Sequence, residues 1–494
     1  MKKVREDLFR LNYLEFYDGM LEGLKLNFCD ENEINTNVFF NVLIGENGVG
    51  KSIILRTIID IFLQLEALKR KDLKRRRLIP VNQYKLIYTF GNEKYTIIKR
   101  NSTIEVFIND LQIKNIDMLK LPEKVMACSF LINDKFIFRK NNNESIYRYL
   151  GIRVHNTMTN TSLVVKQIAN NIINSIDKPE FNKGMKECFN FLNLYPECKL
   201  VYKIKKKELF FCGDITEKNL FDRFDELWSK RSTQAFGFNI VKELKKNIYE
   251  LKEIVSLINN IAHKINNKGE LIYTIDFNEK NIILDNNINL KLLSVLSKMD
   301  ILSNPEVYIR KNDIYSLESG SSGEIHILFL MTNILSNIDK YSLILIDEPE
   351  ISLHPNWQMK IINLLKTVLR NCDDNVHSII ATHSHFMVSD LDKKSSSVLV
   401  IEKKNQSIIS KEIKEDTYGW SAENILYNVF NVPSTRNYYL ADELDCILEE
   451  ISMGKIEEIT DKLDKLKCIL PNLKDNDPLK EVIEKILEKV EHCE

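Results

Sequence analysis

A glycine-rich segment near the amino terminus carries the clearest chemical signal. Residues 45–52 read G-E-N-G-V-G-K-S, which has the spacing G-x-x-x-x-G-K-S. The segment follows a buried apolar run at 38–44 and precedes an amphipathic pattern at 53–65, which predicts a strand, a tight loop and a helix. Glycines let backbone amides face a phosphate, and the helix start adds a positive dipole end. The pattern predicts a phosphate-binding loop in which Lys51 reaches the β- and γ-phosphates and Ser52 ligates Mg²⁺. The predicted nucleotide-binding residues of this loop are Gly45, Glu46, Asn47, Gly48, Val49, Gly50, Lys51 and Ser52.

Two later segments end in side chains that suit phosphate hydrolysis. Residues 343–348 read L-I-L-I-D-E, an apolar run that ends in Asp347 and Glu348. Carboxylates at the end of a central parallel strand can hold a metal ion and accept a proton from water. We therefore predict Asp347 as a metal ligand beside Ser52, and Glu348 as the general base. His383 follows a second apolar run, and at the end of a neighbouring strand it could hydrogen-bond a γ-phosphate.

A third segment could bind an anion. Residues 319–324 read S-G-S-S-G-E and precede an apolar helical pattern at 325–335. The amides of a helix start point outward with the positive end of the dipole behind them, so Ser321, Ser322 and Gly323 are candidate nucleotide contacts. Serine and glycine also cap helices for purely structural reasons, and the pattern alone does not separate the two interpretations.

Together, and in this order, these segments resemble the ABC ATPase superfamily, in particular its soluble branch of chromosome-maintenance (SMC) and RecF-like proteins. The resemblance implies a Walker A loop at 45–52, an ABC signature at 321–324, a Walker B pair at Asp347 and Glu348, a D-loop at 352–354 and a switch histidine at His383. In that family the signature of one protomer covers the nucleotide held by the other. The resemblance therefore implies ATP and Mg²⁺ as cofactors and an ATP-dependent homodimer, with room for a higher oligomer.

Two features depart from the family pattern. The signature begins with Gly320 and Ser321 where the family has Leu-Ser, and no glutamine can be assigned to the Q-loop. Further segments at 129–136, 147–152 and 418–436 resemble the ATPase subunits of bacterial anti-phage systems such as Septu, including retron-associated versions. There the ATPase works beside a separate HNH-type nuclease. The resemblance implies a sensor or regulator subunit with such a nuclease as its partner.

The elements around these motifs predict an α/β fold: a split P-loop ABC-type ATPase head with a mostly helical insertion and a helical C-terminal segment. Alternating segments between 84 and 108 predict antiparallel hairpins. Strands at 342–346 and 378–381, joined by a helix at 357–369, fit a right-handed βαβ crossover. The expected domains are the first part of the head at 1–138, the insertion at 139–310, the second part of the head at 311–437 and amphipathic helices at 438–494.

Composition limits the class of protein. The chain has 494 residues, of which 44% are hydrophobic and 28% charged, with a net charge of −1, as in a globular protein. There is no apolar stretch of about 18 residues and no signal-peptide core at the start, so we expect a cytoplasmic protein without a membrane segment. The nine cysteines form no C-x-x-C pair, which favours reduced thiols over disulfides or a zinc site.

Two regions have strong charge of opposite sign. Residues 69–77, from Lys69 to Arg77, hold seven cations against one aspartate, and either nucleic-acid contact or a solvated helix end would explain them. From Asp442 to the end, eight lysines stand against sixteen acidic residues, which leaves −8. We expect this acidic segment and the insertion to provide docking surface for a partner.

Three other classes of protein compete with this interpretation. An overcoming-lysogenization-defect (OLD) nuclease would carry a Toprim metal site, which Glu402 with Asp475 and Asp477 could imitate, although no glycine follows Glu402. A RecF- or SMC-type recombination and repair ATPase would bind DNA by itself through residues 69–77. A transport ATPase would accompany membrane segments, and none is encoded here.

Overall fold

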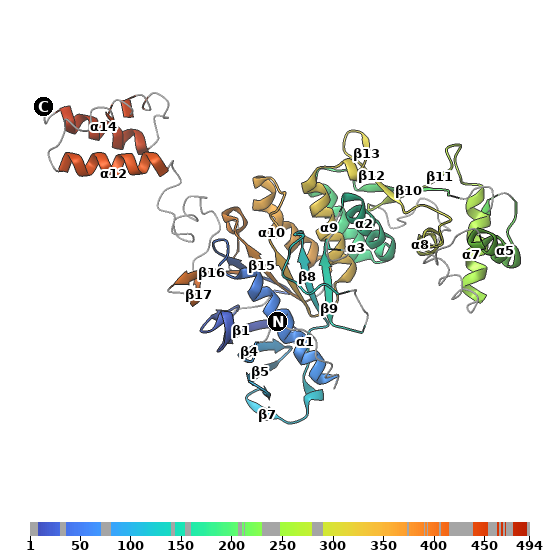
Figure 1. The fold of residues 1–494 in the computed structure, drawn as a ribbon, viewed down its shortest axis with the longest axis horizontal. Coiled ribbons are helices and arrows are strands. Elements are labelled where there is room, and N and C mark those ends of the chain that lie inside the picture. Colours follow the sequence, from blue (N-terminus) through green and yellow to red (C-terminus); the bar gives the residue numbers. More distant parts are fainter. Residues whose placement is uncertain are drawn as a thin grey trace, which may run out of the picture. The chain divides into compact units, whose positions relative to one another are not determined.

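The structure is a computed structural model, drawn in Figure 1, and its chain divides into one unit at 1–420 and a second at 421–494. The predicted basic segment after Arg70, the Septu-like segment at 418–436 and the aspartates 475 and 477 lie outside the described residues. The residues that the structure describes are 8–29, 36–70, 81–139, 144–153, 160–205, 210–211, 213–229, 248–278, 290–372, 375–389, 391–392, 394–404, 407–413, 438–452, 462–463, 466–467, 470 and 478–491.

A seven-stranded sheet forms the centre of the first unit, in the order β17-β16-β3-β15-β14-β8-β9. All neighbouring strands pair in parallel except β17, which is antiparallel to β16. Strands from both parts of the predicted head alternate in this order, so the split α/β head is confirmed. The strands are β3 (Val38–Ile44), β8 (Lys124–Ser129), β9 (Tyr147–Gly151), β14 (Ser342–Asp347), β15 (Val376–Thr382), β16 (Ser396–Lys404) and β17 (Ser407–Ile413).

The register of this sheet brings several strand ends to one edge. Every residue of β3, β14 and β15 is buried, as expected for strands covered on both faces. Asp347 lies opposite Ala381 on one side and Ser129 on the other, and Thr382 lies opposite Ile44. The loops that follow β3, β8, β14 and β15 therefore begin at the same edge of the sheet.

A second sheet and one helix cover one face of the central sheet. The second sheet is antiparallel, in the order β2-β1-β4-β5-β6-β7, and the hairpins predicted between 84 and 108 are confirmed. Helix α1 (Lys51–Lys69) contacts β8, β14 and β15, and its buried residues form one hydrophobic cluster with both sheets. The strands of this sheet are β1 (Phe9–Phe16), β2 (Lys25–Asn27), β4 (Gln83–Phe90), β5 (Glu93–Arg100), β6 (Thr103–Ile108) and β7 (Leu111–Ile113).

A group of four helices packs together beside the central sheet (Figure 1). Helix α9 (Ser322–Asn337) contacts β8 and β9, and α10 (Pro355–Arg370) contacts β3 and forms the predicted crossover between β14 and β15. Helices α2 (Thr161–Ser175) and α3 (Pro179–Phe191) pack on α9, and α3 also packs on α10. The first helices of the insertion are thus part of the ATPase head.

The insertion also contains strands that the sequence analysis did not anticipate. One of them, β9, joins the central sheet, and three others form an antiparallel sheet together with β13, in the order β11-β10-β12-β13. Its strands are β10 (Glu197–Lys203), β11 (Glu270–Asp276), β12 (Glu306–Arg310) and β13 (Ile314–Ser316). The remaining described helices of the insertion are α5 (Glu217–Ser229), α7 (Ile248–Ala262) and α8 (Leu290–Lys298).

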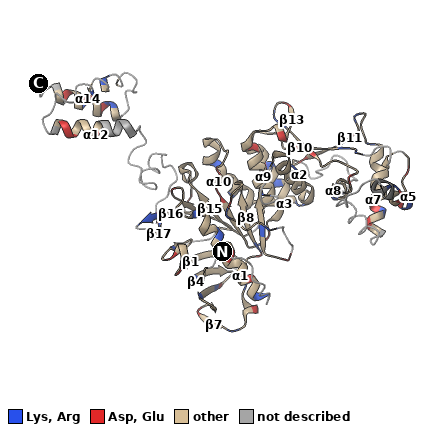
Figure 2. Cartoon of the chain, viewed as in Figure 1, with Lys and Arg blue, Asp and Glu red and all other residues tan. Residues whose placement is uncertain are grey.

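The second unit has a small core of its own. Helices α12 (Tyr438–Ser452) and α14 (Pro478–Glu491) carry most of it, and α14 begins at a proline, which suits the first turn of a helix. Figure 2 shows charges of both signs along α14. Among the described helices of the whole chain, none combines the length and apolar character needed to cross a membrane. The buried core residues are Ile447, Leu463, Leu466, Leu479, Ile483, Ile486 and Val490.

The contact between α3 and α9 allows a test of whether the insertion helices are fixed to the head. A Cβ at Gly184 would lie 2.7 Å and 2.8 Å from the two terminal methyl carbons of Leu335. We expect Gly184→Leu to separate these helices, at a cost of about 1–3 kcal/mol or more, and to lower the thermal unfolding midpoint. The control is Lys183→Leu on the exposed side of α3. Equal midpoints for the two variants would contradict this packing.

Candidate active site

The loop between β3 and α1 contains glycines in backbone conformations that other residues rarely adopt. Gly48 and Gly50 have φ angles of 81° and 98°, in the left-handed region. Gly50 immediately precedes α1, whose first residue is Lys51, as the motif predicts. Residues 46–48 of the loop are exposed. The loop therefore presents its backbone to solvent at a helix start, where amides can bind a phosphate.

Gly45 is needed for a different reason, which is close approach of another strand. A Cβ at this position would lie 2.2 Å from the carbonyl oxygen of Ile401, in β16. Backbone at that distance cannot be moved aside cheaply, so only glycine fits. The first glycine of the motif thus lets β16 pass directly against the loop.

Lys51 is buried and folds back onto its own loop. Its ammonium group donates hydrogen bonds to the carbonyl oxygens of Gly45 at 2.8 Å and Glu46 at 3.0 Å. Burial lowers the pKa of Lys51, while the carboxylates of Glu348, Glu350 and Asp347 oppose that shift. The lysine therefore lies within the electrostatic reach of all three acidic groups.

A hydrogen bond joins the two predicted metal ligands. Ser52 Oγ donates to Asp347 Oδ1 over 2.9 Å, which links the first turn of α1 to the end of β14. Burial, and then the charges of Glu348 and Asp134, raise the pKa of Asp347 to about 7. A hydroxyl and a buried carboxylate are hard oxygen donors, and this donor chemistry fits Mg²⁺.

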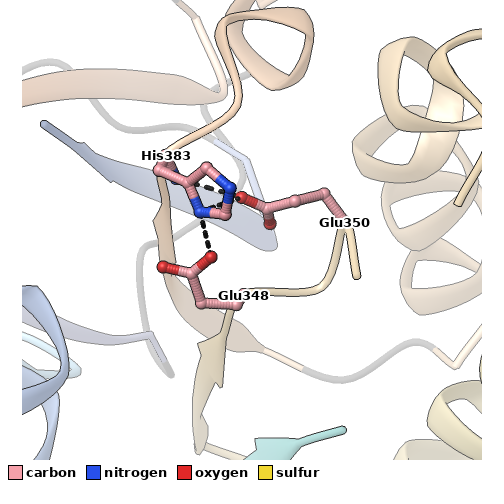
Figure 3. Close-up of side chains that lie close together, drawn as sticks. All are labelled: Glu348, Glu350 and His383. Carbon is pink, nitrogen blue, oxygen red and sulfur yellow. Dashed lines mark hydrogen bonds and ion pairs between the residues drawn. The ribbon is translucent and has the colours of Figure 1, made fainter. Parts of the chain in front are cut away.

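Glu348 adopts an unusual backbone conformation at the end of β14. Its φ angle is 53°, in the left-handed region, and its N–H donates to the carbonyl oxygen of Ala381 over 2.9 Å. This turn places its carboxylate against Nδ1 of His383, at the end of the neighbouring strand β15 (Figure 3). Burial, and then the charge of Glu350, raise the pKa of Glu348. Left-handed residues of this kind are often found at active sites.

Glu350 belongs to the same cluster, although the sequence analysis did not single it out. It is buried, and its Oε1 accepts hydrogen bonds from the hydroxyl of Thr382, from the N–H of His383 at 3.0 Å and from the N–H of Ser384 at 3.2 Å. His383 Nδ1 also lies 3.4 Å from this oxygen. Glu350 therefore fixes the backbone on either side of His383. The only sequence signal was a third acid two residues after Glu348.

The start of α9 combines a helix cap with tight packing. Ser321 Oγ accepts from the N–H of Glu324 at 3.2 Å, and Glu324 Oε2 accepts from the N–H of Ser321 at 2.9 Å, which is a capping box. A Cβ on Gly323 would lie 2.9 Å from the ring of Trp357 and 3.1 Å from the carbonyl oxygen of Ser352. Ser321 and Ser322 are exposed. Ser321 and Gly323 therefore have structural roles, because Ser321 caps the helix and Gly323 allows close packing.

His326, one turn into α9, connects three parts of the head. Its ring stacks on Phe130 with centroids 4.2 Å apart, and its Nδ1 donates to the carbonyl oxygen of Ile351 over 2.6 Å. Phe130 follows β8, and Ile351 follows the Walker B-like pair. The imidazole is fully buried, which lowers its pKa to about 4. Helix α9 is thereby fixed to both loops at the site edge of the sheet.

The loop after β8 is anchored to α1 and to β9. Arg56 donates to the carbonyl oxygen of Lys135 over 2.6 Å, and Asp134 accepts from Tyr149 at 2.7 Å and from Arg153 at 2.6 Å. Burial raises the pKa of Asp134, and the tyrosine and arginine contacts oppose that shift. This aspartate, whose charge reaches Asp347, was also missed in the sequence.

The predicted site residues that come from α1 and from the ends of β14 and β15 lie close together. Lys51, Ser52, Asp347, Glu348 and His383 lie at the same edge of the sheet and interact in the pairs described above. The contacts described for Ser321, Ser322 and Gly323 lie instead within α9 and with α10 and the loop before it.

The rival Toprim-like site finds no support among the described residues. Glu402 pairs with Lys404 at 3.2 Å, and the one cluster of three or more histidine, cysteine or acidic side chains with metal-ligand spacing in the described part of the chain is Glu348, Glu350 and His383. The aspartates that would complete such a site lie outside the described residues.

A glycine loop between a parallel strand and a helix, with a serine bonded to an aspartate at the end of a nearby strand, defines a P-loop ATPase. The family model described as "AAA ATPase domain" matches residues 20–388. The chain belongs to this family.

Curated relatives match shorter stretches. Septu protein PtuA of Bacillus thuringiensis is 32% identical over 198 residues, which are 37% of this chain and 48% of the relative. Protein ea59 of Escherichia phage lambda is 29% identical over 171 residues, 31% of each chain. The chain thus spans about half or less of the length of these relatives. An SMC head domain from Thermotoga maritima aligns with 82% of this chain and 100% of its own, at 11% identity and a TM-score of 0.36, an overlap from which we draw no conclusion.

The buried imidazole of His326 predicts a pH dependence of stability. Its pKa of about 4 lies below the ordinary value of 6.5, so between these values the unfolded chain binds a proton that the folded chain does not. Stability should therefore fall as the pH drops from 6.5 toward 4. The contribution of His326 to this loss of stability is about 1.4 kcal/mol of unfolding free energy for each pH unit. In His326→Phe, which keeps the ring stacking, this contribution should be absent.

The comparison needs the free energy of unfolding in urea for both proteins at pH 8, 7 and 5.5. At pH 7 and 8 the variant should be less stable by a constant amount, since the carbonyl of Ile351 loses its partner. Below pH 6.5 the difference in the free energy of unfolding between the two proteins should become smaller. A constant gap over the whole range would show that His326 is not the group responsible.

Proposed function

We propose that the residues at this edge bind and hydrolyse ATP in the roles that the sequence predicts. The exposed loop residues 46–48 and the start of α1 would receive the phosphates, and Lys51 would exchange its contacts with loop carbonyls for contacts with the β- and γ-phosphates. Ser52 and Asp347 would hold Mg²⁺, which would neutralise phosphate charge when bound. The observation that supports this most is the hydrogen bond between Ser52 and Asp347.

Glu348 is the group best placed to accept a proton. Its raised pKa favours proton uptake, and its carboxylate contacts His383 rather than a lysine or arginine. In this proposal Glu348 takes the proton of the attacking water, while His383 hydrogen-bonds the γ-phosphate. Glu350 is a positioning residue, because it holds the backbone N–H groups of His383 and Ser384.

The catalytic site is proposed to be completed by a second copy of the chain. Ser321 and Ser322 are exposed at a helix start, whereas nearly all the rest of α9 is buried. Their described contacts do not reach the phosphate loop of the same chain. An exposed helix start offers amides and a positive dipole end to an anion, so two heads facing each other could each cover the other's nucleotide.

The likeness to PtuA supports a role in anti-phage defence. We propose that the protein is the sensor or regulator subunit of a complex with a separate HNH-type nuclease, and that it works in the cytoplasm. The second unit, with its own core and acidic helices, is the proposed docking surface for that nuclease. The alternative of a DNA-binding repair ATPase depends on residues 69–77, of which only Lys69 and Arg70 are described.

Replacing the proposed general base should separate nucleotide binding from hydrolysis. Glu348→Gln keeps the size of the side chain but cannot accept the proton, so we expect turnover to fall by at least about 100-fold and ATP to trap a dimer. Size-exclusion chromatography with light scattering, with and without ATP and Mg²⁺, measures the assembly. Lys51→Ala is the matched control and should bind no nucleotide and stay unassembled. Normal turnover in Glu348→Gln would remove this residue from the role of base.

Removing the second unit should separate docking from catalysis. Deletion of 438–494 takes away α12 and α14 with the core between them. We expect unchanged ATP hydrolysis and ATP-dependent dimerisation, together with loss of co-purification with the proposed HNH-type nuclease partner. Charge reversal at Lys480 and Lys485 of α14 is a milder control that keeps the helices. Retained co-purification after the deletion would place the docking surface elsewhere.

A further inference from the structure

The acidic cluster beside the phosphate loop contains a ligand set that hydrolysis alone does not require. We propose that Glu348, Glu350 and His383 form a second cation site, separate from the Ser52–Asp347 pair, which takes a divalent transition-metal ion such as Zn²⁺. While the ion is bound, the ATPase is inactive. The binding stands on geometry alone, and the inhibition rests on the proposed role of Glu348 as general base.

The three side chains already have the spacing of ligands around one ion. One nitrogen of His383 and one carboxylate oxygen from each glutamate all lie within 4.8 Å of one another. His383 Nδ1 is 3.4 Å from Glu350 Oε1, and two ligands of a tetrahedral zinc ion lie roughly 3.3 Å apart. Figure 3 shows the imidazole between the two carboxylates. Glu348 contacts the same Nδ1 directly, so these two side chains must move apart to admit an ion.

Glu350 supplies an independent reason to expect a ligand. Its Oε1 accepts three hydrogen bonds, from Thr382, His383 and Ser384. Its Oε2 is buried and has no hydrogen-bond partner among the residues that the structure describes, and the whole residue is only 4% exposed. A buried carboxylate oxygen without a partner is energetically unfavourable. A cation next to it would remove that penalty.

The local charge balance also favours a cation. Asp347, Glu348 and Glu350 act together on Lys51, whose ammonium group is hydrogen-bonded to backbone carbonyls instead of to any of them. The charge of Glu350 raises the pKa of Glu348, which reflects repulsion between the two carboxylates. An ion between them would turn this repulsion into attraction.

The donor set selects the kind of ion. Mg²⁺ prefers oxygen ligands, which Ser52 and Asp347 offer, whereas imidazole nitrogen with carboxylates suits Zn²⁺ or Mn²⁺. Three protein ligands leave a position open for water. Buried thiols are weak competitors, because burial raises the pKa of Cys128, Cys188 and Cys198 and keeps them protonated.

An ion at this site would occupy the groups on which hydrolysis depends. Coordination to the ion would draw electron density from the carboxylate of Glu348 and hold it in place, which makes it a weaker base toward a water molecule. His383 would be held by the same ion and could not turn toward a phosphate. Zinc would therefore inhibit by withdrawing both groups, without displacing Mg²⁺ from Ser52 and Asp347.

Zinc binding to the nucleotide-free full chain tests the site directly. Glu350→Gln keeps a carbonyl oxygen for Thr382 and the two amides but replaces the unpartnered oxygen, and Glu402→Gln is the matched control in β16, outside the cluster. Titration against a competing chelator should give one zinc ion per chain whose affinity falls at least about 10-fold in Glu350→Gln and is unchanged in Glu402→Gln. Equal affinity in all three proteins would overturn the site.

Mn²⁺ gives a second measurement that does not depend on activity. Electron paramagnetic resonance should show coupling of the bound Mn²⁺ to an imidazole nitrogen, and His383→Gln should abolish it. The Ser52–Asp347 pair offers no nitrogen, so Mn²⁺ bound there cannot produce this signal. If Glu350→Gln fails to fold, the loss of coupling in His383→Gln still decides the question, and coupling that persists overturns the proposal.

Inhibition is measured in zinc-buffered ATPase assays, with each protein compared with its own zinc-free rate. The zinc concentration for half inhibition should rise at least about 10-fold in Glu350→Gln. Zinc binding without inhibition would overturn the inhibitory role but keep the site. Normal turnover in Glu348→Gln would instead contradict the proposed function, while the nucleotide-free binding result stands by itself.

Discussion

The hydrogen bond from Ser52 to Asp347 joins two segments that are 295 residues apart in the sequence, and the site depends on it. Strand β3, which leads into the phosphate loop, does not pair with β14; β15 lies between them. Helix α1 packs against β14 and β15, and its first turn brings Ser52 to the end of β14. Because all three strands are parallel, their carboxyl ends meet at one edge.

Parts of the site could be predicted from the sequence because their signals are local. The glycine loop, the two acids after an apolar run and His383 each stand at the end of a strand that is buried on both faces, and such strands read as continuous apolar runs. Glu350 could not be found in this way. Its importance comes from the approach of two strand ends, which brings Thr382 and Ser384 to its carboxylate.

The strands of the insertion were missed for a related reason. Strand β10 pairs with β11, about 75 residues later, and with β12, more than 100 residues later, so no hairpin turn marks the pairing. The helices α2 and α3 were expected to belong to an insertion, yet they cover α9 and α10 of the head. Helical periodicity predicts that a segment has an apolar face but does not say which surface will cover it.

The start of α9 shows that a structural and a functional interpretation of one motif can both apply. Ser321 caps the helix, and Gly323 admits Trp357 and the carbonyl oxygen of Ser352. His326, one turn further, binds the carbonyl oxygen of Ile351. The exposed tip is thus fixed to the segment that follows Glu348. In each chain the position of this helix start relative to Glu348, the proposed catalytic base, is therefore already set. Two heads could close on each other without a rearrangement between the helix start and Glu348 in either chain.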